Sequence, residues 1–199
     1  MNKRLLSLTF ILAATILAIV VTFLTSCQSP NMSKQRVAAF RVAVSKTPSA
    51  GFVAGGNAEK IALDNVKAFL ADLSPDNVRA MTRKVYAENA YFNDTLKTLQ
   101  GVDAIEVYLL HTAETVTSIN VEFDDVARSG DDYYLRWRMD FRAPKLSGGE
   151  VIRTIGITQI RFNRDGKVVL HQDFWDSAAG LFEHLPVSNQ MINAVRKRL

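Results

Sequence analysis

Apolar residues recur at steps of three and four positions over residues 57–73, 75–86 and 99–116, which predicts three amphipathic helices. The second is predicted to begin at Ser74 and Pro75, a capping residue followed by proline at the first helical position. A fourth helix is predicted over residues 188–199. The four apolar faces consist, in order, of Ala62, Val66, Phe69, Leu70 and Leu73; of Val78, Met81, Val85 and Tyr86; of Ile105, Leu109, Ala113 and Val116; and of Met191, Ile192, Val195 and Leu199.

After Val116 the pattern changes to strict alternation, rich in β-branched and aromatic residues, which is typical of strands. Four long strands are predicted over residues 118–127, 132–143, 151–163 and 167–176, and a short one over residues 88–94. The long strands are separated by turn residues suited to antiparallel neighbours. Helices followed by a run of strands predict an α+β fold, with a curved antiparallel sheet and helices packed on one face.

The N-terminal residues follow a different pattern. Lys3 and Arg4 precede an uncharged run, residues 5–24, which ends in Leu24-Thr25-Ser26-Cys27. These last four residues resemble the lipobox of bacterial lipoproteins, in which the cysteine is lipidated and becomes the new N-terminus. We therefore predict a lipoprotein signal peptide over residues 1–26, with a retained anchor helix or an ordinary secretory signal as alternatives.

The remaining boundaries and the location follow from this interpretation. Residues 27–57 are predicted to form the lipidated Cys27 and a flexible tether rich in Ser, Pro and Gly, and residues 58–199 to form the domain. The membrane is then a partner through the lipid anchor, at the bacterial cell envelope. Gln28 follows the lipobox in place of the aspartate associated with inner-membrane retention, which favours the outer membrane, facing the periplasm.

Composition narrows the function classes. The chain has 199 residues, a net charge of +4 and a single cysteine, so an internal disulfide is excluded. The charge is small and evenly spread, which argues against nucleic acid as a partner. Three scattered histidines give no recognisable ligand spacing, and we expect neither a metal nor a cofactor.

The element order points to a family. Together with "GVDAI" at the start of the third helix and "HQDFWD" followed by "LFEHLPV", it resembles the SnoaL-like branch of the nuclear transport factor 2 (NTF2) fold over residues 58–190. The resemblance implies a cone-shaped fold in which a bent sheet wraps a pocket closed by helices on its concave face. Members bind small, mostly apolar molecules, and some catalyse acid–base reactions, as do ketosteroid isomerases, polyketide cyclases and limonene epoxide hydrolases.

The limonene epoxide hydrolases resemble this chain most in candidate chemistry. Their pattern is matched by Tyr91 and Asn93 on the first strand, Arg138 and Asp140 on a middle strand, and Asp173 on the last. The resemblance implies that Asp173, Tyr91 and Asn93 hold a water and that Asp140 protonates the epoxide. Strand alternation raises an objection, because it places Arg138 and Asp140 opposite the apolar face unless a bulge intervenes. Turn chemistry at the strand end is an equal alternative for Asn93.

On the last strand, alternation puts His171, Asp173 and Trp175 on one face. A carboxylate facing inward is costly unless it has a donor or a function, so we place Asp173 in the site. Asp176 precedes a short helix and is predicted to cap it. The predicted ligand-binding residues are Trp137, Met139, Thr158, His171 and Trp175.

Three hypotheses of function remain. The first is an extracytoplasmic lipoprotein whose pocket binds a small apolar ligand. The second is an enzyme, resembling a limonene epoxide hydrolase or a ketosteroid isomerase, with Asp173 as general base. The third is a dimeric interaction module, with a homodimer as its simplest form, in which the open face of the sheet docks a partner.

Overall fold

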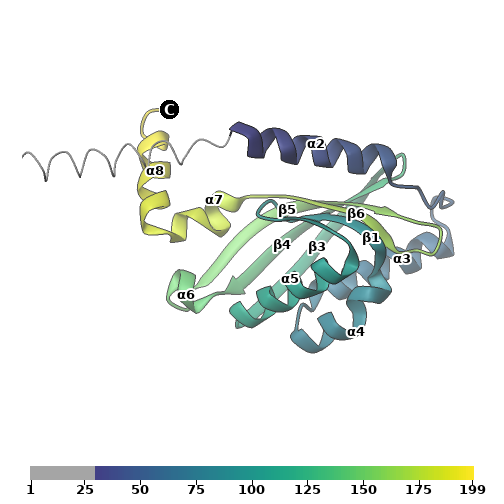
Figure 1. Ribbon diagram of the computed structural model, residues 1–199. Coiled ribbons are helices and arrows are strands. Elements are labelled where there is room, and N and C mark those ends of the chain that lie inside the picture. Colours follow the sequence, from purple (N-terminus) through teal and green to yellow (C-terminus); the bar gives the residue numbers. More distant parts are fainter. Residues whose placement is uncertain (1–29) are drawn as a thin grey trace, which may run out of the picture. The chain divides into compact units, whose positions relative to one another are not determined.

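A six-stranded sheet organises the part of the chain that the computed structural model describes, residues 30–199 (Figure 1). The described residues belong to two separate compact units, 30–42 and 43–199, and helix α2 (Pro30–Lys46) contains the boundary. The predicted signal peptide and the lipidation of Cys27 lie outside the described residues. Among residues 30–199, none of the helices is long and apolar enough to cross a membrane.

The elements of the second unit follow the predicted order of helices, short strand, helix and long strands. The sheet has the order β2-β1-β6-β5-β4-β3. The helices are α3 (Asn57–Ala71), α4 (Pro75–Val85), α5 (Val102–Thr115), α6 (Pro144–Ser147), α7 (Ser177–Gly180), a 3-10 turn η1 (Phe182–His184) and α8 (Pro186–Arg196). The strands are β1 (Tyr86–Asn93), β2 (Thr98–Gln100), β3 (Ser118–Ser129), β4 (Asp132–Arg142), β5 (Val151–Phe162) and β6 (Val168–Trp175).

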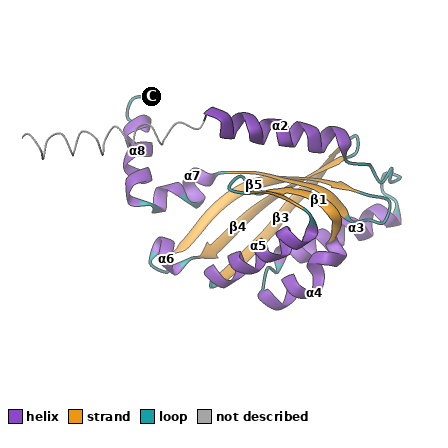
Figure 2. Cartoon of the chain, in the orientation of Figure 1, coloured by secondary structure: helices purple, strands orange, loops and turns teal. Residues whose placement is uncertain are grey.

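The α+β class is confirmed, with one difference in the sheet. Strands β3 to β6 are antiparallel neighbours as predicted, but β1 pairs with β6 in parallel, so the sheet is mixed. The strands curve around helices α3, α4 and α5 (Figure 2). A register irregularity in β3, between Phe123 and Asp125, falls within its pairing with β4 and fits the bend, because bulges increase local twist.

The predicted apolar stripes of α3, α4 and α5 form the core between these helices and the concave face of the sheet. The stripe predicted for the last helix is not part of it, because Met191, Val195 and Leu199 are exposed. Ala62, Val66 and Phe69 of α3 pack with the sheet residues Leu135 and Ile160. Each large apolar side chain buried in this way contributes about 1.5–3 kcal/mol. The predicted caps are also present: Ser74 Oγ accepts a hydrogen bond from Asn77 N at 3.4 Å, and Asp176 Oδ1 from Ala179 N at 3.1 Å.

The segment assigned to the tether contains ordered structure. Residues 30–46 form helix α2, which the sequence pattern missed because the segment lacks a segregated apolar stripe. Arg161 Nη1 donates to the carbonyl oxygens of Val44 at 2.6 Å and Thr47 at 3.2 Å, and the Phe52 ring packs on the core with its centroid 5.9 Å from that of Phe162. Residues 43–57 are therefore part of the sheet domain, which begins before position 58.

A buried carboxylate fixes the start of α3. Glu59 accepts hydrogen bonds from the Tyr133 hydroxyl at 2.7 Å, from Arg128 Nη1 at 2.7 Å and from Gly55 N at 2.6 Å. The Tyr133 hydrogen bond, helped by Gly55 and Arg128 and opposed by burial, lowers the pKa of Glu59 below its ordinary value of 4.5. Burial and the same bond raise the pKa of Tyr133 to about 12, so the phenol remains the donor.

We expect Glu59→Gln to destabilise the chain at neutral pH and progressively less in acid. Because the folded-state pKa is lowered, the carboxylate stabilises the fold fully above pH 4.5, and this contribution is lost as the pH falls through the folded value. Urea unfolding of both proteins across this pH range measures the difference. Asp165→Asn, in an exposed turn, is the control. A difference between Glu59→Gln and wild type that does not shrink in acid would refute this role.

Candidate functional site

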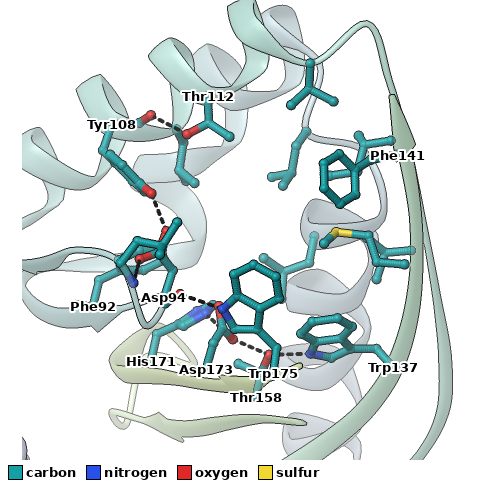
Figure 3. A pocket seen from close by; sticks show the side chains of 18 of the residues that line it. Phe92, Asp94, Tyr108, Thr112, Trp137, Phe141, Thr158, His171, Asp173 and Trp175 are labelled. Carbon is teal, nitrogen blue, oxygen red and sulfur yellow. Dashed lines mark hydrogen bonds and ion pairs between the residues drawn. The ribbon is translucent and has the colours of Figure 1, made fainter. Parts of the chain in front are cut away.

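A cavity of about 220 Å³ lies between helices α3 and α5 and the concave face of the sheet (Figure 3). This volume exceeds the roughly 150 Å³ of a benzene-binding cavity and lies below the roughly 300 Å³ at which drug-sized pockets begin. It suits a ligand slightly larger than benzene. The apolar lining consists of Leu70, Leu73, Phe92, Leu96, Leu109, Val116, Ile119, Val121, Phe123, Met139 and Phe141.

Asp173 lies at the end of this cavity where the two tryptophans, Trp137 and Trp175, gather (Figure 3). Thr158 Oγ1 donates to Asp173 Oδ1 at 2.5 Å, and Trp137 Nε1 donates to Thr158 Oγ1 at 2.8 Å. His171 Nε2 lies 3.0 Å from the same Oδ1. Oδ2 accepts no hydrogen bond from any described residue, so one carboxylate oxygen is held and the other is open to a ligand.

The other nitrogen of His171, Nδ1, lies 2.8 Å from the buried hydroxyl of Tyr86. Burial, and secondarily the charge of Asp173, raises the pKa of Tyr86 well above its ordinary value, so the phenol keeps its proton. Within the described residues that proton has no acceptor other than Nδ1. We therefore assign a neutral His171 that accepts from Tyr86 at Nδ1 and donates to Asp173 from Nε2, which leaves the negative charge on Asp173.

A second carboxylate, Asp94, enters the cavity after β1, but its oxygens are in use. Asp94 Oδ2 accepts from the Tyr108 hydroxyl, and Oδ1 accepts from the backbone N–H groups of Leu96 at 3.0 Å and Lys97 at 2.7 Å. Trp175 Nε1 donates to the Asp94 carbonyl at 2.8 Å. Burial, followed by Asp94, raises the pKa of Tyr108. Asp94 therefore shapes the turn and orients Tyr108 and Trp175.

All the predicted ligand-binding residues, and Asp173 with them, line this one cavity. They are Trp137, Met139, Thr158, His171 and Trp175. Asp94, Tyr108 and Phe92 were not predicted from the sequence. The alternation of β1 could have found Phe92 and Asp94, since they share the face opposite Tyr91 and Asn93.

Tyr91 and Asn93, predicted to hold a water with Asp173, do not line the cavity. The Tyr91 hydroxyl donates to Gln172 Oε1 at 3.3 Å, and Gln172 Nε2 donates to Asn93 Oδ1 at 3.0 Å. Gln172 lies on the face of β6 opposite Asp173. This part of the hydrolase match is wrong, because β1 presents its other face to the cavity.

Arg138 and Asp140 also lie outside the cavity. Arg138 pairs with Asp124 at 2.9 Å and Glu122 at 3.0 Å, and Asp140 with Arg153 at 3.3 Å, all on exposed positions. The bulge that would have turned them inward is absent from β4, which pairs with β5 without a register shift. The resemblance placed them in one site with Asp173, and the structure places them outside the cavity, as the objection from strand alternation predicted.

Gly156 on β5 makes room for the indole of Trp137. A methyl group there would overlap that ring, at 2.5 Å from Cη2, and would lie 2.8 Å from Cβ of Trp175. We expect Gly156→Ala to displace Trp137 from Thr158, to lower the free energy of unfolding by about 1–3 kcal/mol and to shift tryptophan emission. The exposed neighbour Ile155, replaced by Leu, is the control. Unchanged emission in Gly156→Ala would contradict this packing.

The model of the SnoaL-like domain family matches residues 66–171, which is over half of the chain and includes most of the cavity wall. The chain therefore belongs to the SnoaL-like domain family. No curated protein matches it.

Three solved structures illustrate the range of proteins that share this fold. A provisionally named SnoaL-like polyketide cyclase from Jannaschia sp. CCS1 has a TM-score of 0.54 and 16% identity, over 62% of this chain and 91% of that one. An LEH-like epoxide hydrolase from M. tuberculosis has a TM-score of 0.51 and 14% identity, over 67% of this chain and 95% of that one. The third is a hypothetical protein from Catenulispora acidiphila with a ketosteroid isomerase-like fold, in complex with trimethylamine. It has a TM-score of 0.51 and 16% identity, over 58% of this chain and 88% of that one. At these identities the similarity establishes the fold, an NTF2-like α+β cone.

Proposed function

We propose that this domain binds a small, mostly apolar molecule in its cavity, with one polar group of the ligand against Asp173. The observation that carries the proposal is a cavity of about 220 Å³, walled by apolar side chains, with one open carboxylate oxygen at one end. Such a combination of apolar walls and few convergent polar groups is typical of ligand sites. The trimethylamine complex of the Catenulispora acidiphila protein supports the idea that this fold admits a small molecule.

Acid–base catalysis with Asp173 as general base is the second candidate, and the chain of hydrogen bonds through Tyr86, His171 and Asp173 favours it. The open Oδ2 could accept a proton from a water or from a carbon acid. Epoxide hydrolysis by that water and isomerisation of that carbon acid each also need a hydrogen-bond donor for the substrate oxygen that becomes negative. Among the described residues, the cavity donors Trp137, Thr158 and His171 already serve Asp173 or its partner, and for this reason we rank binding first.

The two candidates are separated by testing the full chain for turnover of a panel of epoxides and of β,γ-unsaturated ketones. The binding proposal predicts no turnover that depends on Asp173. Asp173→Asn is the diagnostic variant, and Asp140→Asn, on the outer face of the sheet, is its matched control. Turnover that is lost in Asp173→Asn and kept in Asp140→Asn would establish the enzyme instead.

We further propose that the chain is a lipoprotein of the bacterial cell envelope, lipidated at Cys27 and facing the periplasm from the outer membrane. The support is the sequence Leu-Thr-Ser-Cys after an apolar run, followed by Gln28. Labelled palmitate incorporated at Cys27, with processing that globomycin blocks, is the expected result. A Cys27→Ser chain that stays membrane-bound to the same extent would favour a retained anchor helix.

We also propose that the chain can form a homodimer through the outer face of the sheet. Ile155 and Phe174 lie on that face with 62% and 50% of their surface exposed. Exposed apolar patches of this kind often mark contacts between proteins. Light scattering after size exclusion tests it, and a strict monomer would remove it.

A further inference from the structure

The cavity carries negative charge without a matching cation. Asp94 and Asp173 both line it, and no lysine or arginine of the described residues does. Its single histidine, His171, is neutral in the tautomer that satisfies Tyr86. Asp173 is also poorly hydrated, with 17% of its side chain exposed, so its charge acts strongly on a ligand placed beside it.

Hydrogen-bond donors in the cavity wall are already engaged. Both indole N–H groups donate internally, from Trp137 to Thr158 and from Trp175 to the Asp94 carbonyl. The hydroxyls follow the same pattern: Thr158 donates to Asp173, Tyr108 to Asp94 and Thr112 to the Tyr108 carbonyl. Asp173 Oδ2 is an acceptor without a donor among the described residues. A ligand that fits this wall must therefore bring the donor itself.

Aromatic rings surround the remaining space. Trp137 and Trp175 flank the Asp173 end, while Phe92, Tyr108 and Phe141 lie around the rest of the cavity (Figure 3). The faces of aromatic rings attract cations, by about 2 kcal/mol or more where water is excluded. A neutral alcohol would gain the hydrogen bond to Asp173 but not this attraction.

We propose that the cavity binds a small aliphatic ammonium ion, whose N–H group donates to Asp173 Oδ2 while its hydrocarbon body packs among the aromatic rings. The inference rests on the proposed binding function and specifies the ligand class for the same site. The ammonium group supplies the missing donor and the missing positive charge together.

The test compares two ligands of equal heavy-atom count and similar shape on the full chain at neutral pH. N,N-dimethylcyclohexylamine is protonated there, whereas 1-cyclohexylethanol is neutral. The chain has two tryptophans and both line the cavity, so intrinsic fluorescence reports occupancy directly. We expect the amine to bind at least about tenfold more tightly than the alcohol, which corresponds to about 1.4 kcal/mol.

Asp173→Asn should lower this preference by at least about threefold, because the charge of Asp173 is lost and only the attraction of the aromatic rings remains. Thermal unfolding shows that the variant is folded. Asp140→Asn should keep the wild-type preference, because Asp140 lies on the outer face. Wild-type protein that binds the alcohol as tightly as the amine would overturn the ammonium proposal and leave the binding function intact. Wild-type protein that binds neither ligand would instead count against the binding function and this inference with it.

Discussion

Replacing Val116 and Val121 together by phenylalanine is expected to weaken binding of 1-cyclohexylethanol or N,N-dimethylcyclohexylamine by more than about tenfold. Val116 follows the last residue of α5, Val121 lies on β3, and both line the cavity, so the added rings occupy the space of the ligand. Excluding two methylene groups of a ligand from burial costs about 1.6 kcal/mol, which already exceeds tenfold in affinity. Fluorescence titration of the full chain measures the change.

The matched control is Val107→Phe on α5, where 69% of the valine surface is exposed and the side chain does not line the cavity. This variant should bind as the wild type does. Thermal unfolding should be similar for all three proteins, because the new rings enter empty space rather than a packed core. Equal affinity of the doubly substituted and wild-type chains would show that the ligand binds elsewhere.

Phe69→Ala is expected to destabilise the chain by about 3–5 kcal/mol, the largest effect on stability that we predict. Phe69 of α3 is almost fully buried, and its ring meets Tyr86 edge-on at a centroid distance of 5.9 Å. Truncation removes that contact and leaves a cavity beneath the Tyr86 and His171 pair. Urea unfolding gives the free energy difference.

Phe174→Ala is the control for this substitution, since Phe174 lies on the opposite face of the sheet and is half-exposed. It should cost under about 1 kcal/mol. Equal losses in the two variants would contradict the placement of α3 on the concave face, and with it the wall that closes the cavity.

Sequence alternation predicted the sheet side of the cavity because β4 and β6 pair with β5 without a shift over the residues concerned. It placed Trp137 and Met139 on one face of β4, and His171 and Asp173 on one face of β6. The resemblance to limonene epoxide hydrolases placed Arg138 inside, and the alternation placed it outside. The alternation was correct, since side chains on an unbulged strand cannot change faces.

Other parts of the site depend on contacts between distant residues. Tyr86 was assigned to the apolar face of a helix, but it begins β1 and meets His171, 85 positions away. Asp94 was not among the predicted site residues, and its contact with Tyr108 requires α5 to lie across the end of β1. Periodicity describes which face of an element is apolar, whereas these pairs are set by how elements pack.

A tryptophan fluorescence titration of the full chain, with cyclic amines and alcohols of suitable size, tests directly whether this cavity is a ligand site. We expect a saturable change in the emission of Trp137 and Trp175 that disappears in the chain carrying Val116→Phe and Val121→Phe. No saturable change with any of these ligands, or the same change in both proteins, would contradict it.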